Sequence, residues 1–529
     1  MRIATWLLAC ALVASLPAHA ADFYVDPATG NDANDGSAAR PWRSLQAVID
    51  TDKVRTQDWN ALPWNATRTL VVVNPAAPVR PGDTIWLRSG DYGDFLLRSA
   101  YNTAPVTIAA QPGHVPRFRS VRIEAAQHWI LRGLSISRAH GAPATGGWLL
   151  TIANHNHYGP VRDVEVAASD LSTAPDASAW GVPEWLGAAS GASLGGERNT
   201  LRDSRIRNVR HGISAGGTHA RVIGNSVDGF SADGMRGLGD YGLFEYNVIR
   251  NGYLGSSVDD NHDDGFQSWS VGEGGVGTGE VRGVVLRGNT FINYTDPTNP
   301  LRGSLQGIGC FDGFFVGWVV ENNVVMTNHW HGITFMGMRD SRIANNTVVD
   351  LNTTTPGPPW IQVSAHKDGR PSQDVVVRNN LAMSFTLQGT NITNDRNLAI
   401  GNAAAHFVGW PYNLRLKPGA PGIDTGSAVQ PPALDVLRTP RPQGLGIDVG
   451  AYEACPNGPC PGDGPILREG AAPLRPPVSG TATAAAASTL PGASATQAAT
   501  PSAAPRHGAA RPPAGKTTRA EPRPRQAQR

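Results

Sequence analysis

Residues 321–350, ENNVVMTNHWHGITFMGMRDSRIANNTVVD, contain the pattern that decides the fold. An asparagine pair followed by a short apolar strand occurs twice, with the second asparagine of each pair at Asn323 and Asn346. Another apolar strand, at residues 331–334, separates the two copies. A phrase that returns after 23 residues indicates coils stacked on one another, each of which buries its apolar face only against its neighbours.

The phrase recurs over a large part of the chain. Asparagine takes the matching place at Asn225, Asn247, Asn289, Asn323, Asn346 and Asn380, with spacings of 22, 42, 34, 23 and 34 residues. Asparagine tolerates the left-handed backbone conformation and can hydrogen-bond to its counterpart in the next coil, which explains its recurrence. The pattern predicts an all-β fold, a single-stranded right-handed parallel β-helix. Propeller blades of about 40 residues do not fit the shorter spacings.

Composition agrees with a turn-rich β protein. The 529 residues include 61 glycines and 41 prolines, which disfavours a helical bundle. A formal net charge of +2 excludes a histone-like polyanion binder, so we expect no nucleic-acid partner. No phosphate-binding loop, Ser-His-Asp order or zinc-ligand spacing stands out.

The two ends of the chain differ from its body. Residues 1–20 have a basic start, a short apolar run and small residues before Ala21, which predicts a cleaved signal peptide and a secreted or periplasmic protein. Residues 456–529 are rich in Ala, Pro, Ser and Thr and carry excess basic charge, which predicts a disordered tail. Residues 21–455 then form one β-helix domain, which we expect to be a monomer without an integral membrane segment. Cys455 and Cys460 are expected to pair, and Cys310 to be a buried thiol.

Three segments outside the repeat carry a resemblance. Residues 23–36 (FYVDPATGNDANDG) with 41–48 (PWRSLQAV), residues 81–92 (PGDTIWLRSGDY), and residues 420–426 (APGIDTG) with 446–453 (GIDVGAYE) resemble three parts of the pectin-lyase-like right-handed β-helix superfamily. These parts are its opening strand with an N-terminal capping helix, its first full coil and its closing segment. The resemblance covers residues 22–454 and implies an exported protein of carbohydrate chemistry.

Candidate chemistry lies on the second strand of each coil. Residues 211–214, 233–236, 264–267, 306–309 and 331–334 share the pattern X-Gly-apolar-X. Because strand side chains alternate, we expect the apolar residues to point inward and the others to form two exposed columns with about 4.8 Å between coils. One column reads His211, Asp233, Asp264, Gln306 and His331, and the other reads Ser214, Arg236, Gln267, Gly309 and Thr334.

The densest acidic element lies just before one of these strands. Asp259, Asp260, Asp263 and Asp264 offer oxygen ligands suited to Ca²⁺, which would also bridge an acidic sugar polymer to an acidic protein. Residues 232–234 and 263–265 resemble the calcium-binding aspartates of the family nine pectate lyases. The alternative is a solvated acidic turn.

This local resemblance implies abstraction of the proton alpha to a uronate carboxylate. The lysine base of that family has no counterpart here, because no lysine stands between Lys53 and Lys367. His331 or an arginine such as Arg236 would take that role, Arg236 together with Ca²⁺ would stabilise the enolate, and His262 or Tyr241 would serve as the acid. The site then also includes Asp233 and Asp264, with Gln267, Trp269, Trp330, Arg339 and Lys367 as substrate-binding residues.

Three functions fit these residues. The first is an exported polysaccharide lyase, or a related C5-epimerase, acting on an acidic polysaccharide. The second is an inverting hydrolase, because the order of Asp233, the pair Asp263 and Asp264, and then His331 resembles that of polygalacturonase-type hydrolases, whose aspartates supply acid and base. The third is a carbohydrate-binding β-helix without catalytic activity.

Overall fold

The computed structural model describes residues 20–141, 146–255, 258, 261–456 and 458–460. All of these belong to one compact unit, residues 1–477. The predicted signal peptide, apart from Ala20, and nearly all of the predicted tail lie outside the described residues, so both stay predictions. No helix in the described part of the chain combines the length and the hydropathy that a membrane span requires.

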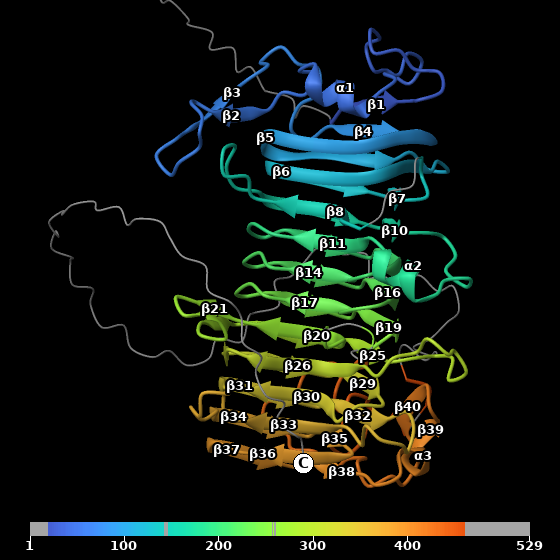
Figure 1. Ribbon diagram of the computed structural model, residues 1–529, viewed down its shortest axis with the longest axis vertical. Helices are drawn as coiled ribbons and strands as arrows, with labels where there is room; N and C mark the ends of the chain where they lie inside the picture. The colour runs from blue at the N-terminus through green and yellow to red at the C-terminus, as the bar shows by residue number, and fades with distance from the viewer. Residues whose placement is uncertain (1–19, 142–145, 256–257, 259–260, 457, 461–529) are drawn as a thin grey trace, which may run out of the picture. The chain divides into compact units, whose positions relative to one another are not determined.

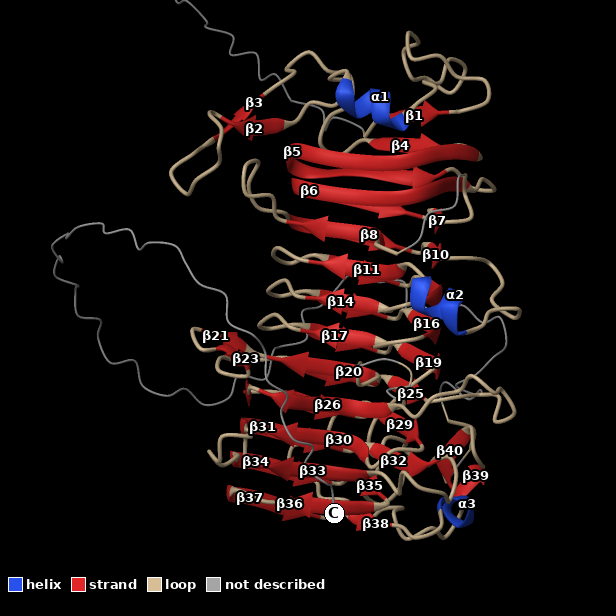
Figure 2. Ribbon diagram, in the orientation of Figure 1, coloured by secondary structure: helices blue, strands red, loops and turns tan. Residues whose placement is uncertain are grey.

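Three columns of parallel strands wrap around one core, as Figures 1 and 2 show. The column that carries the X-Gly-apolar-X strands is called the ladder sheet here. It contains β8 (Trp148–Ala153), β11 (Ser190–Leu194), β14 (Ile213–Ala215), β17 (Met235–Gly237), β20 (Asp264–Trp269), β26 (Gln306–Asp312), β30 (His331–Met336), β33 (Trp360–Ser364) and β36 (Ser384–Leu387).

Each coil continues from the ladder sheet into a second and then a third sheet. The second sheet contains β9 (Arg162–Ala167), β12 (Thr200–Arg202), β15 (Arg221–Ile223), β18 (Leu243–Glu245), β24 (Val285–Arg287), β28 (Val319–Glu321), β31 (Met338–Ala344), β34 (Gln373–Arg378) and β37 (Thr390–Asp395). The third contains β7 (Ser135–Ser137), β10 (Asp170–Ser172), β13 (Arg205–Val209), β16 (Ser226–Phe230), β19 (Val248–Gly252), β25 (Thr290–Ile292), β29 (Val324–Thr327), β32 (Thr347–Asp350), β35 (Leu381–Ala382) and β38 (Leu398–Ala399). Two further strands, β23 (Glu280–Arg282) and β27 (Phe314–Val316), pair with each other beside β31.

The first coils are the longest and carry the predicted capping helix. Here β1 (Asp22–Val25), β4 (Thr84–Leu87), β5 (Gly90–Ala110) and β6 (Pro116–Arg132) stack in parallel, and β2 (Gln57–Trp59) pairs antiparallel with β3 (Leu70–Val72). Helix α1 (Leu45–Asp50) starts at Ser44, whose hydroxyl accepts the Ala47 N–H. Gln46 exchanges two hydrogen bonds with the backbone of Leu96 in β5, which fixes the helix on the coil.

The remaining elements decorate the coils. Helix α2 (Val182–Gly187) lies in the loop between β10 and β11, and a hairpin of β21 (Val271–Gly272) and β22 (Gly275–Val276) follows β20. Helix α3 (Ala403–His406) precedes the antiparallel pair β39 (Phe407–Gly409) and β40 (Asn413–Leu416). Cys455 and Cys460 form a disulfide and Cys310 is a buried free thiol, so both cysteine predictions are confirmed.

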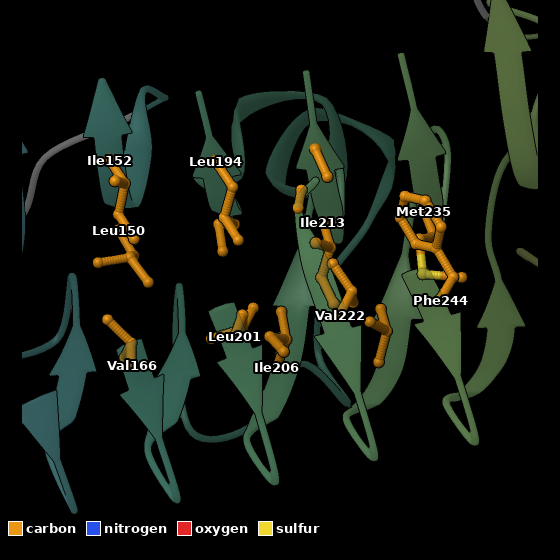
Figure 3. Close-up of a cluster of buried hydrophobic side chains, with 14 of the residues drawn as sticks. Leu150, Ile152, Val166, Leu194, Leu201, Ile206, Ile213, Val222, Met235 and Phe244 are labelled. Atoms are coloured by element: carbon orange, nitrogen blue, oxygen red, sulfur yellow. The ribbon is translucent and has the colours of Figure 1, made fainter. Parts of the chain in front are cut away.

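The core is a continuous column of inward-pointing aliphatic and aromatic side chains. Figure 3 shows Leu150, Leu194, Ile213 and Met235 from successive strands of the ladder sheet facing side chains of the second sheet, such as Phe244, across the interior. The apolar residues predicted to point inward from the ladder sheet are at most 1 % exposed: Ile213, Met235, Phe266, Ile308 and Ile333. Burial of these side chains makes the main contribution to stability, because each strand would expose its apolar face to water if the neighbouring coils were absent.

The predicted asparagine stack forms at the corner between the second and third sheets. Asn289 receives hydrogen bonds from the backbone and side-chain amides of Asn247, and donates to Asn323 in the same way. The stack is formed by Asn225, Asn247, Asn289, Asn323, Asn346, Asn380 and Asn397. One detail of the prediction was wrong: the left-handed backbone belongs to the residue before each stacked asparagine, as at Gly288 and Asn322.

Candidate functional site

The ladder sheet brings the two predicted columns into register. Ser214 pairs with Arg236, Arg236 with Gln267, Gln267 with Gly309, and Gly309 with Thr334. In the other column, Asp264 pairs with Gln306, and the Gly212 N–H and Gly234 N–H donate to the carbonyls of Asp233 and Asp264. Residues as far apart in the sequence as Ser214 and Thr334, about 120 positions, therefore lie on one face of the coil.

The expected exposure of the aspartates was wrong. Asp233 is 1 % exposed and Asp264 is fully buried. Asp233 stands two residues before the inward-pointing Met235, and Asp264 two residues before Phe266. Because side chains alternate along a strand, each aspartate points to the same side as that apolar residue. The outer column covers both carboxyl groups, and the surface above them is formed by Arg236, Gln267 and their neighbours.

Asp233 holds the Arg236 guanidinium. Both Nε and Nη2 of Arg236 donate to Asp233 Oδ2, while the Asp264 N–H donates to Asp233 Oδ1 over 3.1 Å. Burial raises the pKa of Asp233, although the Arg236 charge lowers it in part. The guanidinium lies 5.3 Å from the Trp269 ring centroid and its side chain is 18 % exposed, so it is positioned rigidly at the surface.

Asp264 is less well satisfied. Its Oδ2 accepts the Gln267 amide over 3.0 Å, but its Oδ1 has no hydrogen-bond partner among the described residues. Asp264 Oδ1 occupies the space that a side chain at position 309 would fill. A Cβ added to Gly309 would lie 2.1 Å from Asp264 Oδ1 and 2.6 Å from the Phe311 ring. Burial first, and then the charges of Asp233 and Asp263, raise the pKa of Asp264 well above its usual range.

Next to this carboxyl group lies a cluster of histidines and aromatic rings. The Phe311 ring stands edge-on to His331 at 4.9 Å, and the His331 Nδ1 lies 2.9 Å from the Thr334 hydroxyl, which also accepts the Trp360 indole N–H. His329 stacks on His331 at 5.3 Å, and its Nδ1 accepts the His331 backbone N–H. In neutral His329 the proton therefore lies on Nε2.

Both imidazoles favour the neutral state. Burial lowers the pKa of His331 to about 4. Burial also lowers the pKa of His329 to about 4, assisted by the positive charges that His331 and His262 would carry. The exposed His262 thus lies near this pair. At neutral pH the ladder sheet presents uncharged imidazoles three coils away from a fixed guanidinium.

The predicted substrate-binding residues fall into two groups. Gln267 and Trp269 lie near Arg236 on the outer face of the ladder sheet, and we call this face, from Arg236 to His331, the ladder strip. Trp330, 40 % exposed, packs against His329 at 5.6 Å. Arg339 lies instead in β31, 3.9 Å from the Phe314 ring centroid, and Lys367 donates to Asp312 over 2.7 Å. Within the described part of the chain, neither Arg339 nor Lys367 bonds to His329 or His331, so we place these two cations beside the strip rather than in it.

The described carboxylates do not fit a calcium cage. Asp233 already holds a guanidinium, and the amide N–H groups of Asn261 and Gln267 donate to Asp263 and Asp264. Among the residues that the structure describes, no group of three or more His, Cys, Asp or Glu side chains has the geometry to hold a metal ion. Asp259 and Asp260 lie outside those residues, so the calcium site stays a prediction.

Sequence reasoning missed three parts of the strip. Gly309 leaves room for the Asp264 carboxyl group, and Phe311 and Trp360 enclose His331 from the coils on either side. The ladder register locates Gly309, but a glycine in a column of polar residues gives no sign of what fills its place. Tyr241, considered as an acid, stacks on His219 and is 51 % exposed at another position of the coil.

Comparison with known proteins finds solved structures that are distantly similar to this chain. Similar solved structures include pectate lyase Pel9A (TM-score 0.42, 15 % identity, 82 % of this chain and 96 % of that one) and a rhamnogalacturonan lyase (0.39, 13 %, 73 % and 90 %). The A-module of the mannuronan C-5 epimerase AlgE4 from Azotobacter vinelandii gives 0.33, 12 %, 60 % and 89 %. Comparison with curated proteins gives no match. Such distant likeness does not carry an activity from one protein to another.

The handedness of the coil comes from a family comparison. The family model described as a right-handed β-helix region matches residues 190–354, which include β11 to β32. The strands in this range pair in parallel with the next coil throughout the three sheets. The described coils therefore form the right-handed parallel β-helix that the asparagine repeat and the resemblance to the pectin-lyase-like superfamily predicted.

Proposed function

We propose that the chain is an exported polysaccharide lyase, or a related C5-epimerase, acting on an acidic, uronate-containing polysaccharide. The observation that carries this proposal is the position of neutral His331 on the same outer face as the Arg236 guanidinium. Proton abstraction next to a carboxylate needs a base together with a positive group that stabilises the developing enolate. The ladder sheet carries both on one outer face, Arg236 on β17 and His331 on β30, with the strands β20 and β26 between them.

His331 is the proposed base. With its proton on Nδ1, it donates to the Thr334 hydroxyl, and its Nε2 is left to accept the proton from C5 of the sugar. Arg236, held by Asp233 through Nε and Nη2, would contact a uronate carboxylate of the bound polymer with Nη1. The planar guanidinium suits this role because it stays charged while packed on Trp269.

In elimination, the electron pair of the C5–H bond forms the C4=C5 double bond as the C4–O4 bond breaks. O4 leaves with a proton, and no water is consumed. The N–H group at Nε2 of His329 and the exposed His262 are the groups available to donate that proton. In epimerisation the same carbanion takes a proton on its other face. Asp233 and Asp264 act here as positioning residues under Arg236 and Gln267, because both are buried.

The test is incubation of the secreted protein with pectate, alginate and bacterial exopolysaccharides, followed by ultraviolet absorbance of the unsaturated product. Growth of absorbance shows elimination, whereas deuterium uptake at C5 from heavy water without chain cleavage shows epimerisation. A protein that produces neither change on any of these uronate polymers contradicts the proposal. The His331→Gln variant controls for contaminating activity.

An inverting hydrolase is the second candidate, and the contact between Asp233 and Asp264 is the observation that favours it. Such enzymes use one protonated carboxyl group as the acid and one carboxylate as the base, and the raised pKa of Asp264 suits the acid. Their burial under Arg236 and Gln267 disfavours direct contact with a sugar. New reducing ends without ultraviolet absorbance would identify hydrolysis.

A further inference from the structure

A pocket of about 410 Å³ lies on the third sheet, away from the ladder strip. Helix α2 and the loop before it form one wall, the strands β13 and β16 form the floor, and residues 299–301 complete the rim. Figure 1 shows α2 beside β16, on the side of the coil that follows the asparagine corner. We call it the α2 pocket. Its volume lies within the range of about 300–1,000 Å³ that is usual for small-molecule sites.

Three aromatic rings line the α2 pocket. Trp180 stands edge-on to Trp185 at 4.8 Å, and Trp185 packs on Tyr253 at 4.4 Å. The floor beside the rings is open because Gly229 has no side chain there. Its φ is +81°, and a Cβ added to it would lie 3.2 Å from the Trp185 ring. Rings that face a cavity offer flat apolar surfaces against which the C–H face of a pyranose can stack.

Polar groups converge on the same space. Trp185 is 2 % exposed, yet among the described residues neither its indole N–H nor the Tyr253 hydroxyl has a hydrogen-bond partner. Asn208 and Asp228 lie in the floor. An apolar pocket with a few such donors and acceptors is suited to a ligand that carries several hydroxyl groups.

Charge selects among such ligands. Asp176 and Asp228 line the pocket together with one cationic side chain, Arg207. Arg207 donates to Asp170 over 2.9 Å and Asp228 accepts from Arg250 over 2.7 Å, so Asp176 is the lining charge that forms no ion pair with a described residue. Burial, followed by the charges of Asp228 and Asp296, raises the pKa of Tyr253, which shows that the negative potential reaches its hydroxyl group. A carboxylate would be repelled here, in contrast to its attraction by Arg236 on the ladder sheet.

We propose that the α2 pocket is a second carbohydrate site, which binds a neutral sugar unit and is separate from the uronate site proposed on the ladder sheet. The sugar face packs on Trp180 and Tyr253, and its hydroxyl groups bond to the Trp185 N–H, the Tyr253 hydroxyl and the Asp228 carboxylate. This site anchors the chain to a glycan and needs no catalytic residue.

Calorimetric titration of the full chain with neutral disaccharides (cellobiose, maltose, lactose and xylobiose) and with digalacturonate tests this inference. At least one neutral disaccharide should bind with one-to-one stoichiometry. Trp180→Ala should weaken that binding about tenfold, the equivalent of one stacking contact of about 1.4 kcal/mol. Tyr253→Phe, which removes one oxygen atom without a structural hydrogen bond, should weaken it about threefold to tenfold and leave the melting temperature unchanged.

Trp330→Ala on the ladder sheet is the matched control. It should leave neutral-disaccharide binding unchanged, while turnover of a uronate polymer, where present, should persist in Trp180→Ala. Absence of binding for all four neutral disaccharides overturns the inference. So does equal binding in the unsubstituted chain and in Tyr253→Phe, or displacement of the neutral sugar by digalacturonate. None of these outcomes depends on whether the ladder sheet is catalytic.

Discussion

Two columns of buried polar groups run along the same coil, and they differ in how completely they are satisfied. In the asparagine stack, each amide donates and accepts along the column, as Asn289 does with Asn247 and Asn323. On the ladder sheet, Asp264 keeps an unpartnered oxygen, and burial lowers the pKa of His331. Satisfied polar groups stabilise a fold, whereas groups held in an unfavourable protonation state are typical of working sites.

Breaking the asparagine stack should have the largest effect. Asn289→Ala removes the acceptor of the buried Asn247 N–H and the side-chain donor to the Phe244 carbonyl. At about 1–3 kcal/mol for each group, the free energy of unfolding should fall by about 2–6 kcal/mol. Urea unfolding followed by circular dichroism measures it, and Gln388→Ala, at an exposed position, is the control. An equal change in both variants would contradict a structural role for the stack.

Removing the proposed base should affect turnover instead of folding. His331→Gln should lower the rate of uronate cleavage or exchange about 10²- to 10⁴-fold, the usual contribution of a general base. The melting temperature should change little, because the one hydrogen bond that the His331 ring forms with a described residue goes to Thr334. The exposed His157→Gln provides a matched variant, and a full rate in both variants would remove His331 from the mechanism.

Lowering the pH should affect the contribution of the ladder sheet to stability but not that of the asparagine stack, because asparagine side chains do not titrate. The folded-state pKa of His331 and of His329 is about 4, below the ordinary value of 6.5. Between these values the unfolded chain binds protons that the folded chain does not, so stability should fall as the pH drops from about 6.5 to about 4. Unfolding midpoints across this window should fall less steeply in His331→Gln. An identical slope in both chains would contradict burial of a neutral imidazole.

Removing metal ions should produce a smaller effect still. Arg236 already supplies the positive charge beside Asp233, so the melting temperature should be the same in chelator and in added Ca²⁺. A lower melting temperature in chelator, restored by Ca²⁺, would instead show that Asp259 and Asp260 complete the site predicted from sequence.

The sequence predicted the features that repeat from coil to coil and missed those that depend on side chains covering them from other coils. The asparagine spacing and the inward residues, such as Phe266, follow from periodicity and were confirmed. The burial of Asp264 depends on Phe311 and on the missing side chain of Gly309, more than 40 residues later in the chain. The α2 pocket combines short segments from several coils and a loop, none of which has a distinctive motif. Local patterns cannot predict such contacts, because each depends on insertions of irregular length.

Asp264→Asn tests most directly whether the ladder strip is retained for function. The raised pKa means that ionisation of Asp264 favours the unfolded chain at pH 7, while an amide cannot ionise and still accepts the Gln267 N–H. Asp26→Asn is the matched control, because Thr29, Ala28 and Arg88 hold the pKa of that buried carboxyl group below its usual value despite its burial.

The measurement is the melting temperature at pH 7 together with turnover. We expect Asp264→Asn to melt at or above the temperature of the unsubstituted chain and to lose turnover, while Asp26→Asn melts lower and keeps it. An Asp264→Asn chain that is destabilised as much as Asp26→Asn and remains fully active would show that this carboxyl group serves the fold, as the asparagine stack does.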